Sequence, residues 1–511
     1  MTTLRRLTDV AFWLLAALLA GAHLVVLWQS VTVNPLWEDE AFNLTVPLNL
    51  LAGLGYTSDG TLSGSTLTPF DARISTGPVV LLPIAAVLAF GVDLVVGARL
   101  VPAAFYLALL AAVWLLGRRV GGRWAGLLAV TVPLAFDAAA PPSPIQGPAD
   151  ILGEVPAAAL LAWALVVVQR RPWLAGLLFG LAIQTKYISL LAAPALVLAM
   201  LLSLPGIPLM RRLHAVVLPA VLALVPTAIV ELCALIALGP AGFWQHLRST
   251  VGFVRNGGQP GVTTSVPEKL ATLSASWHLP AAVAAATAIA VVLLIAAAVV
   301  VVRRVPEFGS VRVGAGARVR DTAPLLVAAV VGALTFVGWW ATAMHTPLWV
   351  RHPAPGLLAF VPVLFAFVVP ALGVLWRAAE GRRSAPSPGD TAVAPRGARV
   401  WLVRGAIGLA AVLVATVPAA QAVSAAREAL ASDGAVLAHQ RAIAAEIAVA
   451  DAEWIATQWG GPVSLVVLAG SHVALTDAPP ENIAGYAVLT TDPAACEEPV
   501  VTALPFVVCA P

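Results

Sequence analysis

Charged residues are scarce in this chain of 511 residues. Asp, Glu, Lys and Arg make up 11% of it, whereas soluble globular proteins carry about 25%. Hydrophobic residues make up 60% and the mean hydropathy is +0.91, so most of the apolar surface must face lipid. The composition excludes a soluble enzyme and predicts a protein that crosses the membrane many times.

Sequence features of several common enzyme classes are also missing. The chain has 3 cysteines, too few for a thiolate metal cage or a scaffold of several disulfides. It has no Gly-x-x-x-x-Gly-Lys-Ser/Thr phosphate loop, no His-Glu-x-x-His motif and no sugar-nucleotide fingerprint, which argues against a soluble nucleotide-binding domain. The formal net charge of +3 reflects loop arginines and indicates no nucleic-acid partner.

Long apolar runs fill most of the sequence. The predicted membrane spans cover 10–28, 98–116, 124–139, 155–168, 172–185, 187–203, 214–238, 280–302, 324–344, 354–376 and 400–419. They predict an all-α polytopic membrane protein with about 11 to 13 transmembrane helices. A shorter run over 78–92 would form a helix of about 22 Å, less than the roughly 30 Å hydrocarbon core. We expect it to enter the membrane only part way, although 124–139 and the two runs beside Lys186 are alternatives.

Arginines between the runs predict the orientation. They cluster at the N-terminus, at Arg5 and Arg6, and in alternate connections, which the positive-inside rule places in the cytoplasm. The connections expected to face outward are 29–77, 140–154, 239–279 and 345–353. The heavy use of Ala, Val, Arg and Pro suggests a bacterium, so the expected location is the inner (plasma) membrane, with a cytoplasmic N-terminus.

The sequence changes character after residue 420. Charges return, and helical periodicity runs from Gln421 to Trp459. Strand-like patterns follow at 463–468, 486–490 and 506–508. These patterns predict a small α+β domain.

The expected domains are therefore two. Residues 1–420 form a transmembrane domain with a first outer loop at 29–77, and residues 421–511 form the extracytoplasmic domain. Cys496 and Cys509 are expected to bond there, because their 13-residue separation allows closure and the outside is oxidising.

Three carboxylates, Glu38, Asp39 and Glu40, open the first outer connection. Acids so close to lipid resist being left unpaired, so they need a cation, a metal or a catalytic role. The alternative is a solvated loop start with an N-capping acid.

This position resembles that of the Asp-Glu pair in the type C membrane glycosyltransferases. These enzymes take sugar from a polyprenyl-phosphate carrier and include protein O-mannosyltransferases and lipid A aminoarabinose transferases. The resemblance implies that Asp39 is the catalytic base. Glu40 is the second catalytic candidate, but we expect it to matter less, because consecutive residues on a helix or strand point apart. The run 98–123, with its Arg-Leu-x-Pro and Gly/Arg hairpin, and the run 180–187 around Lys186 resemble further family segments. A positive-inside loop and a snorkelling lysine are their alternatives.

The second outer connection carries Asp150 and Glu154. The two acids are four residues apart and would share a helical face, and the resemblance places an acid here facing the same cavity. A divalent cation, Mg²⁺ or Mn²⁺, bridging them and a phosphate is one hypothesis, although no cofactor is certain. The alternative is an acid at a helix N-terminus that interacts favourably with the helix dipole.

The segment from Trp349 to Pro355 resembles the proline-rich start of a late span where the family binds the carrier phosphate. A guanidinium pairs bidentately with phosphate, so Arg351 fits this role, with help from His352. His246 and Arg255 lie in a segment that resembles the amphipathic helix covering the donor. An interfacial arginine and an ordinary interfacial helix are the alternatives.

The resemblance implies a hexosyl- or pentosyltransferase that uses a polyprenyl-phosphate sugar. The acceptor would be an envelope glycan, lipid or protein at the outer face, and one base predicts inversion. The alternatives are a lipid-linked glycan transporter or flippase, for which Glu231 and Lys186 would mark a translocation path, and a non-catalytic envelope scaffold. Functional residues that cluster on outer loops favour the enzyme.

Overall fold

The computed structural model describes residues 2–60, 66–135, 145–255, 261–276, 281–304, 312–313, 317–381 and 396–511. Within these residues, seven helices are long and apolar enough to cross a membrane. They are α1 (Thr2–Thr32), α4 (Leu94–Gly121), α9 (Leu209–Arg255), α11 (Ala281–Arg304), α12 (Val319–Thr342), α13 (Ala354–Gly381) and α14 (Arg396–Ala431). The prediction of a multi-pass, all-α membrane part is confirmed.

Shorter apolar helices complete the membrane part. They are α3 (Pro78–Leu88), α5 (Arg123–Ala135), α6 (Glu154–Val167), α7 (Pro172–Thr185) and α8 (Ala193–Leu202), which follows a 3₁₀ turn over Tyr187–Ala192. Fourteen residues of helix extend about 21 Å, so α6 and α7 are shorter than the hydrocarbon core. Helix α6 is buried along nearly its whole length because neighbouring helices, and not lipid, surround it.

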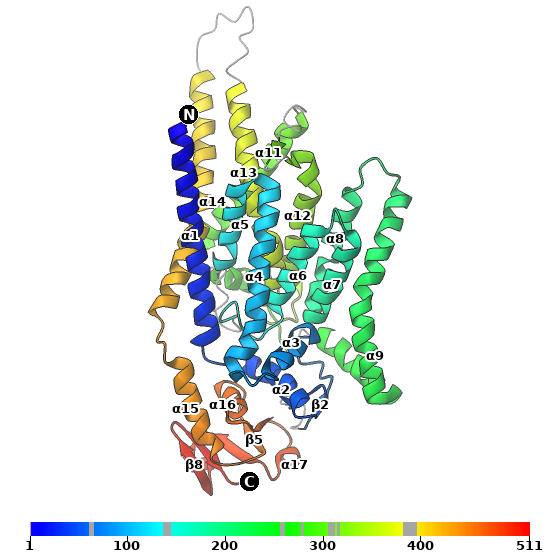
Figure 1. The fold of residues 1–511 in the computed structure, drawn as a ribbon, viewed down its shortest axis with the longest axis vertical. Coiled ribbons are helices and arrows are strands. Elements are labelled where there is room, and N and C mark those ends of the chain that lie inside the picture. The colour runs from blue at the N-terminus through cyan, green and yellow to red at the C-terminus, as the bar shows by residue number, and fades with distance from the viewer. Residues whose placement is uncertain are drawn as a thin grey trace, which may run out of the picture.

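Close helix packing at the edge of the bundle depends on small residues. A Cβ added to Gly176 or Gly180 of α7 would lie 2.1 Å from the carbonyl oxygen of Pro219 or 2.3 Å from that of Ala223, both on α9. Small residues spaced in this way let membrane helices approach. Helix α9 then bends at Gly239, whose φ of 67° is unfavourable for residues with a side chain, and its last part turns at the lower end of the molecule in Figure 1.

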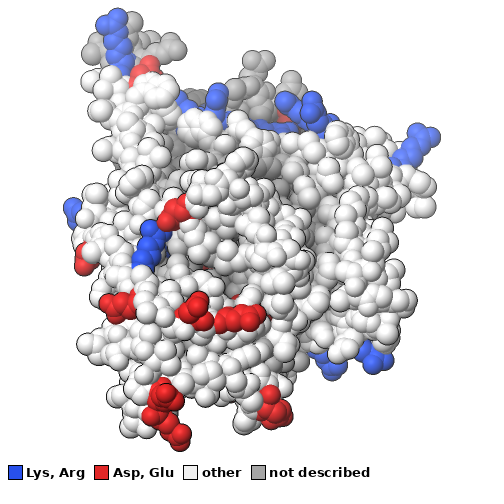
Figure 2. Space-filling view, turned by 60° about the horizontal axis from the view of Figure 1, so that its bottom comes forward, with Lys and Arg blue, Asp and Glu red and all other residues white. Residues whose placement is uncertain are grey.

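The end of the molecule opposite the N-terminus carries the remaining elements (Figure 1). They are α2 (Glu38–Leu51), β1 (Thr57–Ser58), β2 (Thr68–Pro69), α15 (Val436–Ala448), α16 (Gly461–Ala469), α17 (Pro480–Ile483) and a five-stranded sheet. Helix α10 (Val266–Ala275) packs against α11 and α12. Strands β3 (Arg312–Val313) and β4 (Ala317–Arg318) form a separate pair. Figure 2 shows exposed Asp and Glu side chains spread over this end, while many Lys and Arg side chains lie along the opposite rim.

The sheet runs in the order β6-β5-β7-β9-β8. Its strands are β5 (Trp454–Thr457), β6 (His472–Leu475), β7 (Ala487–Thr490), β8 (Pro499–Ala503) and β9 (Phe506–Cys509). Strand β5 pairs in parallel with β6 and β7, and β9 pairs antiparallel with β7 and β8. Cys496 and Cys509 are disulfide-bonded with a Cα–Cα distance of 5.4 Å.

The predicted strands at 486–490 and 506–508 are confirmed, but the one at 463–468 is wrong. That run lies in α16, between Pro462 in its first turn and the left-handed Gly470 that ends it. Periodicity could not reveal this, because its residues are buried on all sides and a short apolar run fits either structure. The predicted helix up to Trp459 also ends early, since β5 lies within it.

The structure has no break at the predicted boundary between the two domains, at residue 420. Helix α14 runs through residue 420 to Ala431, and one hydrophobic core joins α2 and α3 to α15, α16 and the sheet. Polar contacts reinforce it, because the Gln440 side chain bonds the backbone N–H and carbonyl of Leu36. The C-terminal elements therefore hold the loop at 29–77 in place.

Candidate active site

Asp39 lies in the first turn of α2 and pairs with Arg351. Trp37 precedes the helix in an extended conformation, and the three following acids point in different directions from the first turn. Arg351 Nη1 donates to Asp39 Oδ2 across 312 residues of sequence. The Asp39 side chain is 22% exposed and that of Arg351 6%, so the carboxylate reaches solvent while the guanidinium is buried.

Arg351, the neighbouring Trp37 and the next residue, His352, carry buried nitrogen atoms with hydrogen-bonding capacity to spare. Among the described residues, Trp37 Nε1, Arg351 Nε and His352 Nδ1 are buried and have no hydrogen-bond partner. The guanidinium carbon lies 4.6 Å from the ring centroid of Trp349 and 5.7 Å from that of Trp37. A buried donor without a partner costs about 1–3 kcal/mol, so several together suit an acceptor-rich anion.

His352 is held neutral beside this pair. Burial and the positive charges of Arg351, Lys186 and Lys269 keep its pKa well below the usual range. A neutral imidazole presents one donor and one acceptor nitrogen. His352 therefore adds hydrogen-bonding capacity to the site without adding charge.

Glu40 has a different partner from its neighbour. Arg99 Nε donates to Glu40 Oε1 at 3.0 Å and Arg99 Nη2 to Oε2 at 2.5 Å, and both side chains are fully buried. Arg99 also donates to the carbonyls of Asn34 and Pro35 at 2.7 and 2.8 Å, and Glu40 accepts from the N–H of Ile151 at 2.9 Å. Both carboxylate oxygens are thus occupied, which argues against Glu40, the second catalytic candidate, as the base.

Asp150 lies on the side of Glu40 and not of Asp39. Asp150 Oδ2 accepts a hydrogen bond from the N–H of Gln146 at 2.5 Å. The charges of Glu40 and Arg99 act on the Asp150 carboxyl group. Burial, reinforced by Glu40, raises the pKa of Asp150 well above its usual range. The expected helical face shared with Glu154 does not form, because α6 begins only at Glu154.

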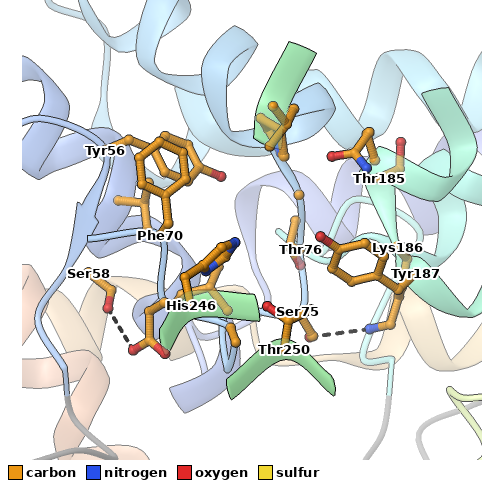
Figure 3. Close-up of a pocket in the computed structure, with 18 of the residues that line it drawn as sticks. Tyr56, Ser58, Phe70, Ser75, Thr76, Thr185, Lys186, Tyr187, His246 and Thr250 are labelled. Carbon is orange, nitrogen blue, oxygen red and sulfur yellow. Dashed lines mark hydrogen bonds between the residues drawn. The ribbon is translucent and has the colours of Figure 1, made fainter. Parts of the chain in front are cut away.

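Glu154 instead forms a buried ion pair with Lys186. The Lys186 ammonium also lies 3.4 Å from Ser75 Oγ (Figure 3). The charges of Asp39 and Arg351 act on it as well. Lys186 therefore joins α6 to the segment around Ser75.

Two glycines hold the turn that carries Lys186. The Gly77 N–H donates to the carbonyl of Thr185 at 2.9 Å. A Cβ on Gly77 would lie 1.8 Å from the carbonyl oxygen of Gln184, and one on Gly153 would lie 2.5 Å from that of Thr185. Only residues without a side chain permit this backbone contact.

Lys269 of α10 fixes the loop before Arg351. Its ammonium is buried and donates to the carbonyls of Trp340 and Ala343 at 2.6 and 2.7 Å and to Thr346 Oγ1 at 2.6 Å. A cation at the last carbonyls of a helix is favourable, so Lys269 caps α12. It thereby anchors the chain from 340 to 346, shortly before Arg351.

His246 and Arg255 do not join the Asp39–Arg351 pair. His246 follows the bend in α9, where its Nε2 lies 3.3 Å from Glu231 Oε2 and its ring contacts Phe70. Arg255 is exposed at the last residue of α9. The phosphate-binding hypothesis expected both residues beside Arg351, and the structure places neither of them there.

The described residues contain no group of three or more His, Cys, Asp or Glu side chains that could hold a metal ion. Glu154 is engaged by Lys186, and Asp150 lies beside Glu40. Among the described residues, Asp150 and Glu154 therefore do not form the ligand set that the divalent-cation hypothesis requires.

Three residues of this region were not among the predicted site residues: Trp37, Arg99 and Lys269. Trp37 directly precedes the acids and so carried a local signal, whereas Lys269 follows Glu268 in a polar stretch and carried none. Arg99 was noted for its motif, but its role depends on Glu40, 59 residues away, and only the fold brings them together.

Comparisons with known proteins give a match by structure. No protein-family model matches the sequence, and no curated protein matches it. Two crystal structures of ArnT from Cupriavidus metallidurans, one bound to undecaprenyl phosphate and one in the apo state, superpose with TM-scores of 0.58 and 0.57. Each covers 97% of both chains, at 15% and 14% sequence identity. AglB from Archaeoglobus fulgidus matches with a TM-score of 0.44 and 13% identity over 91% of this chain and 65% of its own.

The chain therefore has the fold of ArnT over almost its whole length. The fold resemblance to the type C membrane glycosyltransferases is confirmed, including the transmembrane helices and the small C-terminal sheet. A sequence identity of 14–15% establishes a shared fold. The donor, the acceptor and the role of each residue must be argued from the chemistry of the site.

Proposed function

We propose that this protein is a membrane glycosyltransferase that moves a sugar from a polyprenyl-phosphate donor to an acceptor hydroxyl. The main support is the Asp39–Arg351 pair among buried, unsatisfied nitrogen atoms, which offers a base and an anion site together. The ArnT structure with the same fold is bound to undecaprenyl phosphate, a ligand that carries the kind of anion this site suits.

Arg351 would bind the donor phosphate. One of its nitrogens is engaged by Asp39, and its Nε has no partner. A guanidinium has five N–H donors in a planar fork that matches phosphate oxygens. When phosphate occupies this fork, it competes with Asp39 for Arg351 and frees the carboxylate.

Asp39 would then act as the base. As the acceptor oxygen bonds to the anomeric carbon, its proton passes to Asp39, and the bond from that carbon to the phosphate oxygen breaks. The electron pair leaves with the polyprenyl phosphate, whose added negative charge Arg351 stabilises. One displacement inverts the anomeric centre.

The other charged residues would position these two. Glu40 and Arg99 fix the start of α2, Lys269 fixes the loop before Arg351, and the Lys186–Glu154 pair lies between the site and the first outer loop. His352 and Trp37 would contribute neutral hydrogen bonds to the phosphate.

The orientation belongs to the same proposal. The end rich in Lys and Arg (Figure 2) would face the cytoplasm by the positive-inside rule. Asp39, Arg351 and the C-terminal domain (421–511) would then lie outside the inner membrane, where an envelope glycan, lipid or protein is the acceptor.

The test is turnover by purified protein with a panel of undecaprenyl-phosphate hexoses and pentoses, scored as release of undecaprenyl phosphate. We expect release with at least one donor, and a loss of about 10²–10⁴-fold in Asp39→Asn, the usual contribution of a general base. Glu446→Gln, an exposed carboxylate on α15, is the matched control.

The same assay separates the enzyme from a transporter or scaffold. A transporter would move the lipid-linked sugar without releasing its carrier, and a scaffold would do neither. Absence of release with every donor would reject the proposal.

A further inference from the structure

A groove lies between α13 and α14, toward the end of the membrane part that carries the N-terminus. The two helices contact each other and stand side by side there in Figure 1. The groove has a volume of about 480 Å³, within the range of about 300–1,000 Å³ for ligand sites. It is lined by Leu372, Gly373, Trp376 and Arg377 of α13 and by Ile407, Gly408 and Ala411 of α14.

Two glycines leave the groove open. Among the described residues, a Cβ added to Gly408 would meet no atom within 4 Å, and one added to Gly373 would meet Arg377 Nη2 at 3.7 Å. Glycine in a membrane helix commonly lets another helix approach, as Gly176 and Gly180 do on α7. No described helix uses the space beside Gly408 in this way, so a molecule outside the chain can enter it.

Arginines mark one end of the groove. Arg377 follows Gly373 by about one turn on α13, and Arg404 precedes Gly408 by about one turn on α14. Because α13 ends and α14 begins at the upper end of Figure 1, both arginines lie toward that end. Arg377 Nε donates to the carbonyl of Gly373 at 3.0 Å, and the terminal nitrogens of Arg377 have no hydrogen-bond partner in the described part of the chain.

Trp376 indicates the depth of this end in the membrane. Its side chain is 44% exposed, and the guanidinium carbon of Arg404 lies 4.9 Å from its ring centroid, a cation–π contact between the two helices. Tryptophan is enriched where the membrane meets water, because its ring is apolar and its N–H is polar. The arginine end of the groove therefore lies at the level of lipid headgroups, and the remainder lies at the level of acyl chains.

The chemistry of the groove matches both parts of an anionic phospholipid. Leu372, Ile407 and Ala411 offer an apolar surface, and Arg377 carries the charge; no Asp or Glu is among the described residues that line the groove. A guanidinium pairs with two phosphate oxygens. Basic pockets between membrane helices bind anionic lipid headgroups for this reason.

We propose that this groove binds an anionic phospholipid of the surrounding membrane, with its phosphate on Arg377 and an acyl chain against Gly373 and Gly408. Arg404 positions Trp376 and adds positive charge near the headgroup. The inference is independent of the proposed function, because the groove lies at the opposite end of the molecule from α2 (Figure 1), which carries Asp39.

The experiment measures, by native mass spectrometry, the lipids bound to the purified full-length protein. The probes are phosphatidylglycerol, phosphatidylcholine with the same acyl chains, and undecaprenyl phosphate. The variants are Arg377→Gln, which removes the cation, and Gly408→Leu, which fills the groove.

Each variant has a matched control. Arg211→Gln changes an exposed arginine on α9. Gly405→Leu changes a glycine of α14 that does not line the groove and whose added Cβ would also meet no atom within 4 Å. Thermal unfolding of each variant separates a lost site from a lost fold. If Gly408→Leu does not fold, Arg377→Gln, at an exposed side chain, decides alone.

We expect the parent to bind phosphatidylglycerol more tightly than phosphatidylcholine. Arg377→Gln should bind phosphatidylglycerol about tenfold more weakly, the effect of one lost hydrogen bond to a charged group. Gly408→Leu should weaken both phospholipids, because its side chain occupies the space of the acyl chain. Both control variants should bind every probe like the parent, and undecaprenyl phosphate should bind all variants equally.

Three results would overturn the inference. The first is equal affinity of the parent for the two phospholipids, and the second is parental binding of phosphatidylglycerol in folded Arg377→Gln and Gly408→Leu. The third is a loss of undecaprenyl phosphate as large as the loss of phosphatidylglycerol, which would make the groove a site for the polyprenyl carrier.

Discussion

Glu40 and Asp39 are neighbours in sequence, yet their ion pairs differ in a way that separates structure from function. The Glu40–Arg99 pair is fully buried, and further hydrogen bonds from Ile151 and to two carbonyls complete it. The Asp39–Arg351 pair is partly exposed, and Arg351 keeps a buried nitrogen without a partner. A completed pair stabilises the fold, whereas an incomplete one has capacity left for a ligand.

Breaking the Glu40–Arg99 pair should have the largest effect, and this effect should be a loss of stability. Arg99→Met leaves Glu40 buried without its cation, which typically costs about 3–5 kcal/mol. We expect a large drop in the thermal unfolding temperature in detergent, with Arg211→Met, an exposed arginine, as the control.

The double variant Glu40→Leu/Arg99→Met sharpens this expectation. Replacing both members of a buried pair with apolar residues is often tolerated, so part of the stability should return. A double variant less stable than Arg99→Met would contradict this view of the pair.

The incomplete pair should show its effect in catalysis. Arg351→Ala should lower kcat/KM for the donor by about 2–4 kcal/mol, within the range for truncating one partner of a buried charge pair, with a small change in unfolding temperature. Arg351→Lys keeps the charge but loses the fork, so its loss should be smaller but measurable. Parental kinetics in both variants would make Arg351 an interfacial anchor.

Lys269 should affect catalysis from a distance. Lys269→Met removes three hydrogen bonds to the end of α12 and to Thr346, and each acceptor left unpaired costs about 1–3 kcal/mol. We expect lower stability and weaker donor binding, because the loop that carries Arg351 loosens. The matched control is Lys269→Arg, which retains donors, and equal donor affinity in Lys269→Met and the parent would contradict the anchoring role.

Sequence patterns pointed to features with a local signal and failed where the structure depends on burial; the catalytic roles of Asp39 and Arg351 stay predictions. Asp39, Arg351 and the long spans carried their own signals of charge, apolar length and flanking aromatics. The run 463–468 did not, because complete burial hides whether an apolar run is helix or strand. Similarly, the partners of Glu40, Asp150 and Glu154 come from distant segments, so no spacing rule could assign them.

The smallest effect concerns the contact between the first outer loop and the sheet. His472 Nδ1 lies 3.0 Å from Asp59 Oδ1, and this hydrogen bond raises the pKa of His472. The raised folded-state pKa means that the stabilisation is complete below the unfolded value near 6.5 and is lost as pH rises through the folded value.

The parent should therefore lose a little stability as pH rises above about 6.5, and His472→Gln should flatten that change. Unfolding temperatures measured across this window test it, with His439→Gln on α15 as the control. An identical slope in the His472 variant and the parent would contradict the role of this contact.

The most direct test of the central claim is the affinity for undecaprenyl phosphate in the parent and in Asp39→Asn. If phosphate replaces Asp39 on Arg351, removing the competing carboxylate charge leaves binding equal or stronger while release of undecaprenyl phosphate from a sugar donor is lost. Weaker binding in folded Asp39→Asn, or retained turnover, would contradict the assignment of base and anion site to this pair.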